Sequence, residues 1–306
     1  MIRINREKLL EMSVSGEISH PLLPRSGYDI GADGKARLLP GVGGITYNYR
    51  IGDPACGLAA DHVEPGASVK QGGKGNEREN AALNLLACVG NRAKVVSGDA
   101  KGGEGFVTGK HGGIEHVIVD FEKDVLEKLN IGDKVLIRAH GVGMELPDYP
   151  EIKVMNCSPD LFEAVNPGPI AGGRIEVGVA MVIPAAIMGS GLGHDSCHSG
   201  DYDIQMFDGA SVERYGLARL RIGDLVAIMD ADNSYGRIYL KGAVTVGVVV
   251  HSDSTVSGHG PGVTTLLTSG KGLIKPVTDA GANLKALLKP ARKVPGKRNG
   301  AGGKKK

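Results

Sequence analysis

The sequence has few aromatic residues and no strong charge bias. Trp is absent, aromatic residues make up 4% of the 306 residues, and the formal net charge is +2. Single-stranded nucleic acids are bound by aromatic platforms in basic grooves, so these scarcities argue against a nucleic-acid partner. The basic residues gather instead near the C-terminus, at Lys289, Arg292, Lys293, Lys297, Arg298, Lys304, Lys305 and Lys306.

Long apolar runs and closely spaced cysteines are also missing. No apolar stretch approaches the ~18 residues that a membrane-spanning helix needs. The N-terminal segment MIRINREKLLEMSVSGEI is too charged for a secretory signal. The four cysteines, Cys56, Cys88, Cys157 and Cys197, form no CxxC pair, which is typical of reduced thiols rather than of a disulfide framework. The sequence therefore predicts a cytoplasmic protein without a membrane partner.

Glycine is abundant, and its placement predicts a fold built mainly of strands. The 48 glycines show no third-position repeat, so they mark turns and bulges rather than a collagen-like chain. Short alternating segments, such as GGITYNYR at residues 43–50, predict half-buried strands. The clearest helix is expected over residues 77–89, where Leu83 and Leu86 share one face. We expect only a few short helices besides it.

An internal repeat is the main sign of organisation. Residues 126–137, LEKLNIGDKVLI, align without gaps on residues 217–228, LARLRIGDLVAI. In each copy a Gly-Asp turn opens an alternating strand, and Asp133 and Asp224 are expected to bond their own backbone there. Duplicated β units usually pair into one barrel or sandwich, because neither closes a core alone.

The likeness extends upstream when a few residues are gapped. HGGIEHVIVDF at 111–121 then lies over HSGDYDIQMF at 198–207, which places His111 opposite His198 and His116 opposite Asp203. We therefore expect a duplicated β-barrel or sandwich core over residues 105–275, with repeat units at about 107–140 and 194–231. Residues 1–104 are expected to form an α+β region packed on that core, and residues 276–306 a short helix and a basic tail.

The stretch MGSGLGHDSCHSGDYDI at residues 188–204 is unusually rich in chemically active side chains. It contains His194, Asp195, Cys197, His198, Asp201 and Asp203 between glycines. Such groups are costly to bury unless they bind something, so the stretch predicts a functional site. A second loop, HSDSTVSGHGPGV, adds His251, Asp253 and His259.

A divalent metal site is the interpretation that we favour for these loops. Imidazole and carboxylate groups bind zinc well, and zinc is favoured over calcium or magnesium. The two copies would share one site if they paired about a pseudo-two-fold axis, and Asp195 or Asp201 would serve as a general base. His62, beside Asp61, is held in reserve. The predicted ligands are His111, His116, His194, His198, Asp203, His251, Asp253 and His259.

Two alternatives to a metal site stay open for the 188–204 stretch. In the first, Cys197 is a nucleophile, although adjacent residues of an extended segment point to opposite faces, which places His198 poorly to activate it. In the second, the stretch forms polar turns without a ligand, and Cys197 is a small buried apolar residue.

Some of these motifs resemble the acetamidase/formamidase family of metal-dependent amide hydrolases. Residues 107–109 and 131–135 are similar to its Thr-Gly turn and Gly-Asp-x-Val strand, and residues 199–203 to its Gly-Gly-Asn-x-Asp loop. The resemblance covers the duplicated core and implies metal-dependent amide hydrolysis by a symmetric homo-oligomer. That family's His-x-x-Gln-Gly-Asp-Gly-Glu run has no match, and Val226 stands where its His would fall. The whole chain also resembles an uncharacterised bacterial and archaeal family known only as a domain of unknown function, which implies no activity.

Three functions therefore remain. The first is a metal-dependent hydrolase or lyase that acts on a small polar substrate such as an amide. The second is a β protein that binds a small molecule or a metal without catalysis, for which the missing acetamidase run argues. The third is a structural or interaction protein whose basic tail docks on an acidic partner.

Overall fold

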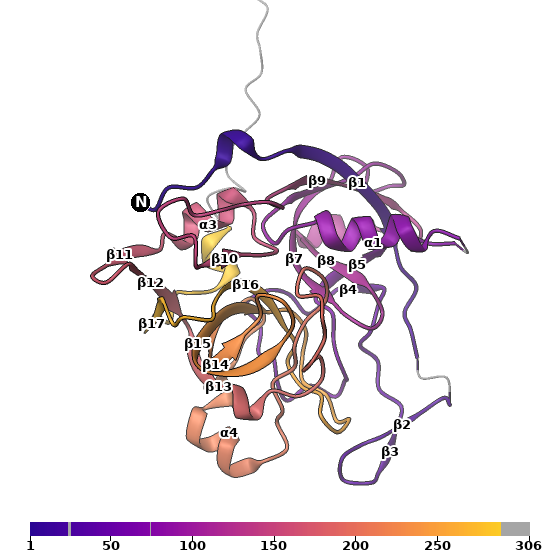
Figure 1. Ribbon diagram of the computed structural model, residues 1–306. Helices are drawn as coiled ribbons and strands as arrows, with labels where there is room; N and C mark the ends of the chain where they lie inside the picture. The colour runs from indigo at the N-terminus through magenta and orange to yellow at the C-terminus, as the bar shows by residue number, and fades with distance from the viewer. Residues whose placement is uncertain (24–25, 74, 289–306) are drawn as a thin grey trace, which may run out of the picture.

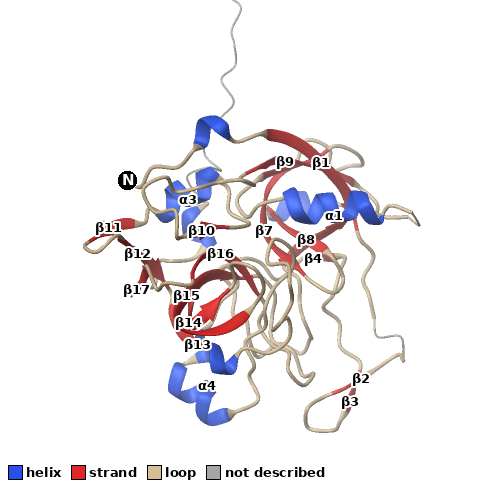
Figure 2. Cartoon of the chain, viewed as in Figure 1, coloured by secondary structure: helices blue, strands red, loops and turns tan. Residues whose placement is uncertain are grey.

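The computed structural model describes residues 1–23, 26–73 and 75–288. The predicted basic tail from Lys289 onward lies outside the described residues. The prediction of a mainly β protein with a few short helices is confirmed. Figure 1 and Figure 2 show two groups of strands, a barrel formed by the N-terminal half and further sheets formed by the C-terminal half.

Six antiparallel strands form a closed barrel. Each strand pairs with the next, and a pairing between the last and the first closes the ring, while β4 (Ile45–Thr46) adds to its outside. Closure removes the exposed edges of the sheet. The ring order is β1 (Glu11–Ile18), β9 (Lys134–His140), β6 (Arg92–Val95), β7 (Glu104–His111), β8 (His116–Phe121) and β5 (Gly66–Lys70).

The burial pattern of the barrel strands explains where the core lies. Alternate residues of β9 are buried, as expected for a strand with one face on a core. Strand β8 is buried at every position, because Val117 and Val119 pack inside the barrel while Ile118 packs in the core of the second half. Helix α1 (Glu77–Leu86) covers the barrel through Leu83. The boundary between the two cores therefore runs along β8.

The second half is built from smaller sheets. A five-stranded sheet has the order β10 (Lys153–Val154), β16 (Val263–Ser269), β15 (Ile238–Val249), β14 (Leu225–Asp232) and β13 (Met181–Pro184), with only β13 and β14 parallel. A three-stranded sheet has the order β11 (Gly168–Ile170), β12 (Arg174–Val179) and β17 (Ile274–Thr278), and β2 (Asp29–Ile30) pairs with β3 (Ala36–Arg37). The remaining helices are α2 (Lys123–Leu126), α3 (Pro159–Val165), α4 (Gly209–Tyr215), α5 (Leu284–Leu287), and the 3₁₀ turns η1 (Arg6–Lys8), η2 (Ala185–Ile187) and η3 (Leu217–Arg219).

The two Gly-Asp turns of the internal repeat have the same geometry. Asp133 accepts a hydrogen bond from the backbone N–H of Asn130, and Asp224 accepts one from Arg221, each at 2.8 Å. The preceding glycine has a positive φ in both copies, 87° and 83°. The first turn leads into β9 of the barrel and the second into β14 of the five-stranded sheet.

The two repeat units meet through their upstream loops. The backbone N–H of Gly112 donates to Asp201 at 2.9 Å. A Cβ atom on Gly200 would lie 2.8 Å from the Cα atom of Gly112, so the two loops cross too closely for a side chain there. The crossing brings the ends of β7 and β8 beside the loop that follows η2.

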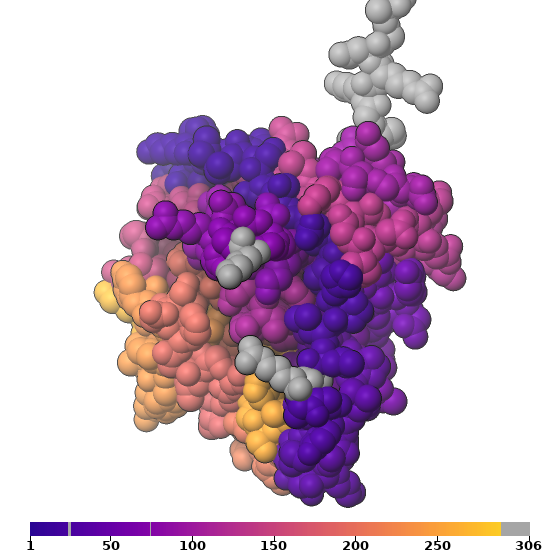
Figure 3. Space-filling view, turned by 90° about the vertical axis from the view of Figure 1, so that its right-hand side faces the viewer, coloured from indigo at the N-terminus to yellow at the C-terminus, as the bar shows by residue number. Residues whose placement is uncertain are grey.

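Segments from the two ends of the chain also lie together. Figure 3 shows an orange-yellow segment of the second half against the indigo N-terminal part. There the backbone N–H of Ala32 donates to the carbonyl of Thr255 at 2.8 Å. Within the ranges given above, the helices are too short or too polar to cross a membrane.

Candidate metal centre

Histidine and aspartate side chains from four segments converge at the crossing of the two loops. His111 ends β7, His251 follows β15, and His62 and His259 lie in the loops before β5 and β16. Asp201 and Asp203 lie in the loop between η2 and α4. These residues form two groups in which the ligand atoms lie within 4.8 Å of one another. The buried group is His111, Asp201 and His251, and the open group is His62, Asp203 and His259.

The histidines of the buried group are oriented through one ring nitrogen each. His111 Nδ1 lies 2.5 Å from Glu64 Oε1, and His251 Nδ1 lies 2.8 Å from the carbonyl of Ser252. An acceptor on Nδ1 fixes the tautomer in which Nε2 carries a free lone pair, the arrangement found behind metal-binding histidines. Both Nε2 atoms therefore face the group, where they could serve as metal ligands once deprotonated.

The Asp201 carboxylate completes the buried group. Its Oδ1 accepts the bond from Gly112, while its Oδ2 lies 2.5 Å from His251 Nε2. These two atoms form an ion pair in the metal-free protein. An ion bound at this point would replace the direct contact between the carboxylate and the ring.

Gly262 makes room for these two atoms. A Cβ atom on Gly262 would lie 2.0 Å from Asp201 Oδ2 and 2.2 Å from His251 Nε2. Real Cβ atoms do not approach other atoms so closely, so any side chain at this position would displace the carboxylate and the ring. The absence of a side chain at Gly262 is thus part of the architecture of the buried group.

Opposite charges are coupled in the buried group. Burial would raise the pKa of Asp201, but His251 and His111 hold it well below its usual range. Burial would lower the pKa of His251, but the Asp201 carboxylate raises it to about 9. At neutral pH the metal-free pair is a carboxylate and an imidazolium. Metal binding at His251 would therefore release a proton.

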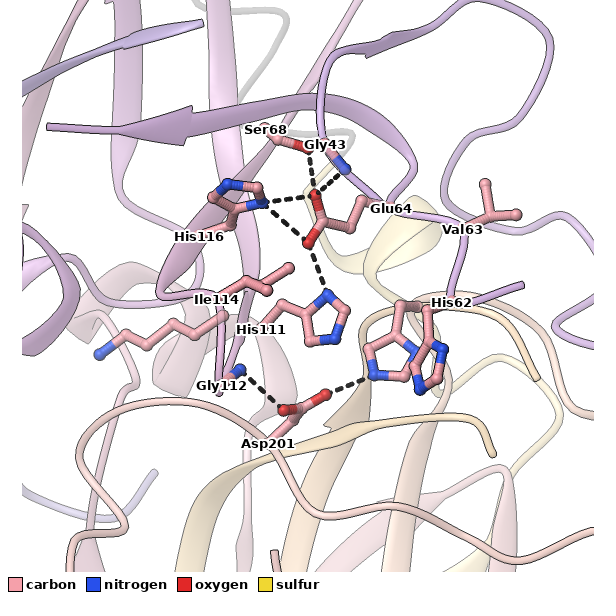
Figure 4. Close-up of polar contacts among 12 residues, drawn as sticks. Gly43, His62, Val63, Glu64, Ser68, His111, Gly112, Ile114, His116 and Asp201 are labelled. Atoms are coloured by element: carbon pink, nitrogen blue, oxygen red, sulfur yellow. Dashed lines mark hydrogen bonds and ion pairs between the residues drawn. The ribbon is translucent and has the colours of Figure 1, made fainter. Parts of the chain in front are cut away.

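Glu64 anchors the buried group from the barrel side. Figure 4 shows its carboxylate between the rings of His111 and His116. Glu64 accepts hydrogen bonds from His116 Nδ1 at 2.9 Å and from the backbone N–H of Gly43 at 2.9 Å, and it also accepts one from Ser68. Burial would raise the pKa of Glu64, but the hydrogen bonds from His111 and His116 hold it well below its usual range. Glu64 is therefore an ionised support for His111.

The open group reaches the surface. Asp203 Oδ2 lies 3.0 Å from His259 Nδ1 and 4.0 Å from His62 Nε2, and these two nitrogens lie 3.0 Å apart. His62 Nδ1 contacts Asp61 Oδ1, which again leaves Nε2 toward the group. The side chain of His259 is 35% exposed, whereas that of His251 in the buried group is 0% exposed. Exposure to solvent is therefore greatest at His259 of the open group.

Several predicted site residues lie outside both groups. The side chains of His194 and Asp195 are 55% and 98% exposed. Cys197 and His198 line a separate cavity of about 690 Å³. Burial raises the pKa of the Cys197 thiol, whereas a thiol nucleophile needs a lowered pKa.

Two further predicted ligands have other surroundings. His116 lies behind the buried group, where its contact is with Glu64. Asp253 accepts a hydrogen bond from the backbone N–H of Gly57 at 3.1 Å and belongs to neither group.

Glu64 is a site residue that the sequence patterns did not reveal, and His62 was only held in reserve. Both belong to the segment Asp61-His62-Val63-Glu64, in which Val63 is buried in the core. This segment contains three side chains that can bind metal within four residues, and it stands directly before the buried strand β5. That density was the sequence signal for a site at this position.

The fold and the site together define a mainly β protein with a closed barrel and a buried cluster of histidines and carboxylates at the junction of its two halves. Residues 28–163 match the family model described as "Domain of unknown function (DUF4438), N-terminal", and residues 169–288 match the corresponding C-terminal model. The chain belongs to the DUF4438 family.

A solved structure titled "Crystal structure of TM1086" is similar to this chain. The identity is 49%, the match covers 93% of this chain and 98% of the other, and the TM-score is 0.87. No curated protein matches. The resemblance to the acetamidase/formamidase family stays a prediction.

Proposed function

We propose that this protein binds zinc or a similar divalent ion in its His/Asp cluster and uses it to hydrolyse a small polar substrate such as an amide. One observation carries the proposal. Two groups of histidine and aspartate side chains place their ligand atoms within 4.8 Å of one another, and in the buried group Asp201 Oδ2 lies 2.5 Å from His251 Nε2. Next to them, the ring of His111 is oriented by Glu64. These are the features of a prepared ligand set.

The donor set favours zinc. Each group offers two imidazole nitrogens and one carboxylate oxygen, which is the ligand composition of many zinc sites. Calcium and magnesium prefer oxygen ligands and higher coordination numbers. Iron, cobalt or manganese would accept the same donors with a different geometry.

The open group is the better place for catalysis. Catalytic zinc sites have three protein ligands and one position for water or substrate, and the partly exposed His259 borders such a position. A bound divalent ion lowers the pKa of water and polarises a carbonyl group. The ion would supply an activated water, and hydrolysis would add the hydroxyl group of this water to the carbonyl carbon and transfer its remaining proton to the amine as the C–N bond breaks. In this proposal Asp61 orients His62, and Asp201 is a ligand rather than the general base, because its lowered pKa makes it a weak base.

A metal-binding role without catalysis is the second candidate. Val226, which stands where the acetamidase family has a histidine, is fully buried in β14 and contributes only to the core. A substrate panel separates the two candidates.

The test begins with the metal content of the purified protein, measured by mass spectrometry, for wild type and for His251→Ala. His194→Ala is the matched control, because this exposed histidine lies in neither group. We expect zinc in wild type and in the control, and a loss of zinc in His251→Ala. Equal zinc in all three proteins would contradict the proposal. Amides and esters are then tested with and without a chelator, and hydrolysis by wild type that the chelator abolishes is the result expected for an enzyme.

A further inference from the structure

We propose that the two groups form one dinuclear metal centre in which the carboxylate of Asp203 bridges two ions. This inference rests on the proposed metal binding and deepens it. The buried and open groups each contain three residues with ligand atoms. Asp203, however, faces both of them.

The two carboxylate oxygens of Asp203 point to different groups. Oδ2 lies 3.0 Å from His259 Nδ1 in the open group, and Oδ1 lies 3.8 Å from His251 Nε2 in the buried group. Two ligands of one tetrahedral zinc ion, each about 2.1 Å from the metal, lie about 3.4 Å apart. Both separations are close to that value. Each oxygen is therefore placed to share an ion with one histidine.

Side chains alternate in direction along the loop, which explains how the carboxylates of Asp201 and Asp203 both face the histidines. Side chains at positions i and i+2 of an extended segment point to the same side. Asp201 and Asp203 have this spacing, while Tyr202 between them points into the hydrophobic core, where it is 1% exposed. The Asp-Tyr-Asp sequence thus anchors the loop by its ring and presents both carboxylates to the histidines.

The histidine rings are close enough for a common centre. The ring centroids of His111 and His251 lie 4.3 Å apart, and those of His62 and His251 lie 5.2 Å apart, although His62 and His251 belong to different groups. In two-metal sites the ions lie about 3.5–4 Å apart. A carboxylate bridge sets a separation of this size, and a water molecule can then contact both ions.

The charge of the cluster matches two divalent ions rather than one. Four carboxylates lie in or directly behind the two groups, those of Asp61, Glu64, Asp201 and Asp203. Four carboxylates can offset the charge of two divalent cations. With a single ion, the buried cluster would retain an excess of negative charge.

Titration of the metal-stripped full chain with Mn²⁺, followed by electron paramagnetic resonance, tests the bridge. Two Mn²⁺ ions that share a carboxylate are magnetically coupled, so the ordinary six-line signal of an isolated ion is weakened or replaced by a multiline signal. We expect this change between one and two equivalents of bound Mn²⁺. A six-line signal that doubles in proportion to the second bound ion, or saturation at one ion, would overturn the bridge while leaving metal binding intact.

Variants of two aspartates in the same loop sharpen the test. Asp203→Asn keeps only one oxygen for coordination, so we expect an uncoupled signal and the loss of one bound ion per chain. Asp195→Asn is the matched control, since its exposed side chain belongs to neither group, and it should behave as wild type. A coupled signal that survives in Asp203→Asn would assign the bridge to another residue and contradict the inference. No Mn²⁺ or Zn²⁺ bound by wild type would contradict the proposed function itself.

Discussion

The buried and open groups have the same ligand types but different surroundings. In the buried group the side chain of His251 is 0% exposed, and the buried carboxylate of Glu64 supports His111. In the open group the side chain of His259 is 35% exposed, and Asp61, which is itself partly exposed, supports His62. Burial strengthens electrostatic attraction but prevents access, whereas exposure has the opposite effect. We therefore expect the buried group to retain an ion and the open group to exchange one.

The largest effect is expected on zinc affinity when one histidine is removed from either group. The two variants should show which group retains its ion and which exchanges it. In His251→Ala we expect the tightest zinc site to weaken by more than about 100-fold, because one direct ligand is lost, an effect larger than that of its supporting residues. His259→Ala should leave that tight site and abolish the weaker one, together with hydrolysis. Chelator competition titrations measure both affinities. Equal loss of the tight site in both variants would contradict the division into a retaining and an exchanging group.

In the metal-free protein, the ion pair between His251 and Asp201 should make the free energy of unfolding depend on pH. The pKa of His251 is raised to about 9, so its contribution is fully present below the unfolded value near 6.5 and is lost as the pH rises through 9. The difference corresponds to about 3 kcal/mol, at about 1.4 kcal/mol per pKa unit. Urea unfolding of wild type and His251→Gln at pH 6 and pH 9.5 measures it. Wild type should lose more stability over this interval than the variant, and parallel losses would contradict the coupling with Asp201.

Each supporting carboxylate should affect the metal affinity of only the group behind which it lies. Glu64→Gln keeps the shape of the side chain but removes the charge behind His111, and Asp61→Asn does the same behind His62. Loss of a supporting carboxylate typically costs about 10–100-fold in metal affinity. Glu64→Gln should therefore weaken the tight site and Asp61→Asn the exchangeable one, as followed by zinc titration calorimetry. The reverse pattern would show that the two supports are assigned to the wrong groups.

The smallest effect is expected when the space beside the buried ligands is filled by a substitution at Gly262. Gly262→Ala places a methyl group against Asp201 Oδ2 and His251 Nε2, which we expect to destabilise the protein by about 1–3 kcal/mol. Gly209→Ala is the control, because a Cβ atom there meets nothing within 4 Å. Thermal unfolding of both variants gives the comparison. An unchanged melting temperature in Gly262→Ala would mean that the ligands are less closely placed than described.

Local patterns predicted much of the fold. The predicted helix over residues 77–89 begins at Glu77 as expected and ends at Leu86. Asp133 and Asp224 bond to the backbone of their turns, each through the N–H group three residues earlier. These features depend on neighbouring residues alone. Barrel closure by the pairing of β1 with β5 depends on segments far apart in the chain, and the alternation of each strand contains no information about its partner. The domain boundaries at residues 105 and 275 stay predictions.

The candidate site was predictable in composition but not in geometry. His111, Asp203, His251 and His259 were predicted as ligands, and all four lie in the two groups. The repeat alignment, however, placed His198 opposite His111, whereas the close contact between the copies is at Gly112 and Gly200. The backbone carbonyl of His198 accepts a hydrogen bond from the buried Lys110, and its side chain lines the separate cavity.

Glu64 shows what sequence patterns leave out. It lies 47 residues before His111 in the chain, yet the two side chains are in contact. These segments come together because β5 pairs with β8, which in turn pairs with β7. A residue that supports a ligand from a neighbouring strand cannot be recognised before the strand order is known.

Zinc titration of the metal-stripped protein tests the central claim most directly. Isothermal calorimetry is performed on wild type and on the double variant His111→Ala/His251→Ala, with circular dichroism to verify the fold of both. Wild type should bind two zinc ions per chain, one more tightly than the other, and the double variant should lose the tight ion. Wild type that binds no zinc, or a folded double variant that binds zinc as wild type does, would contradict the assignment of the His/Asp cluster as a metal centre.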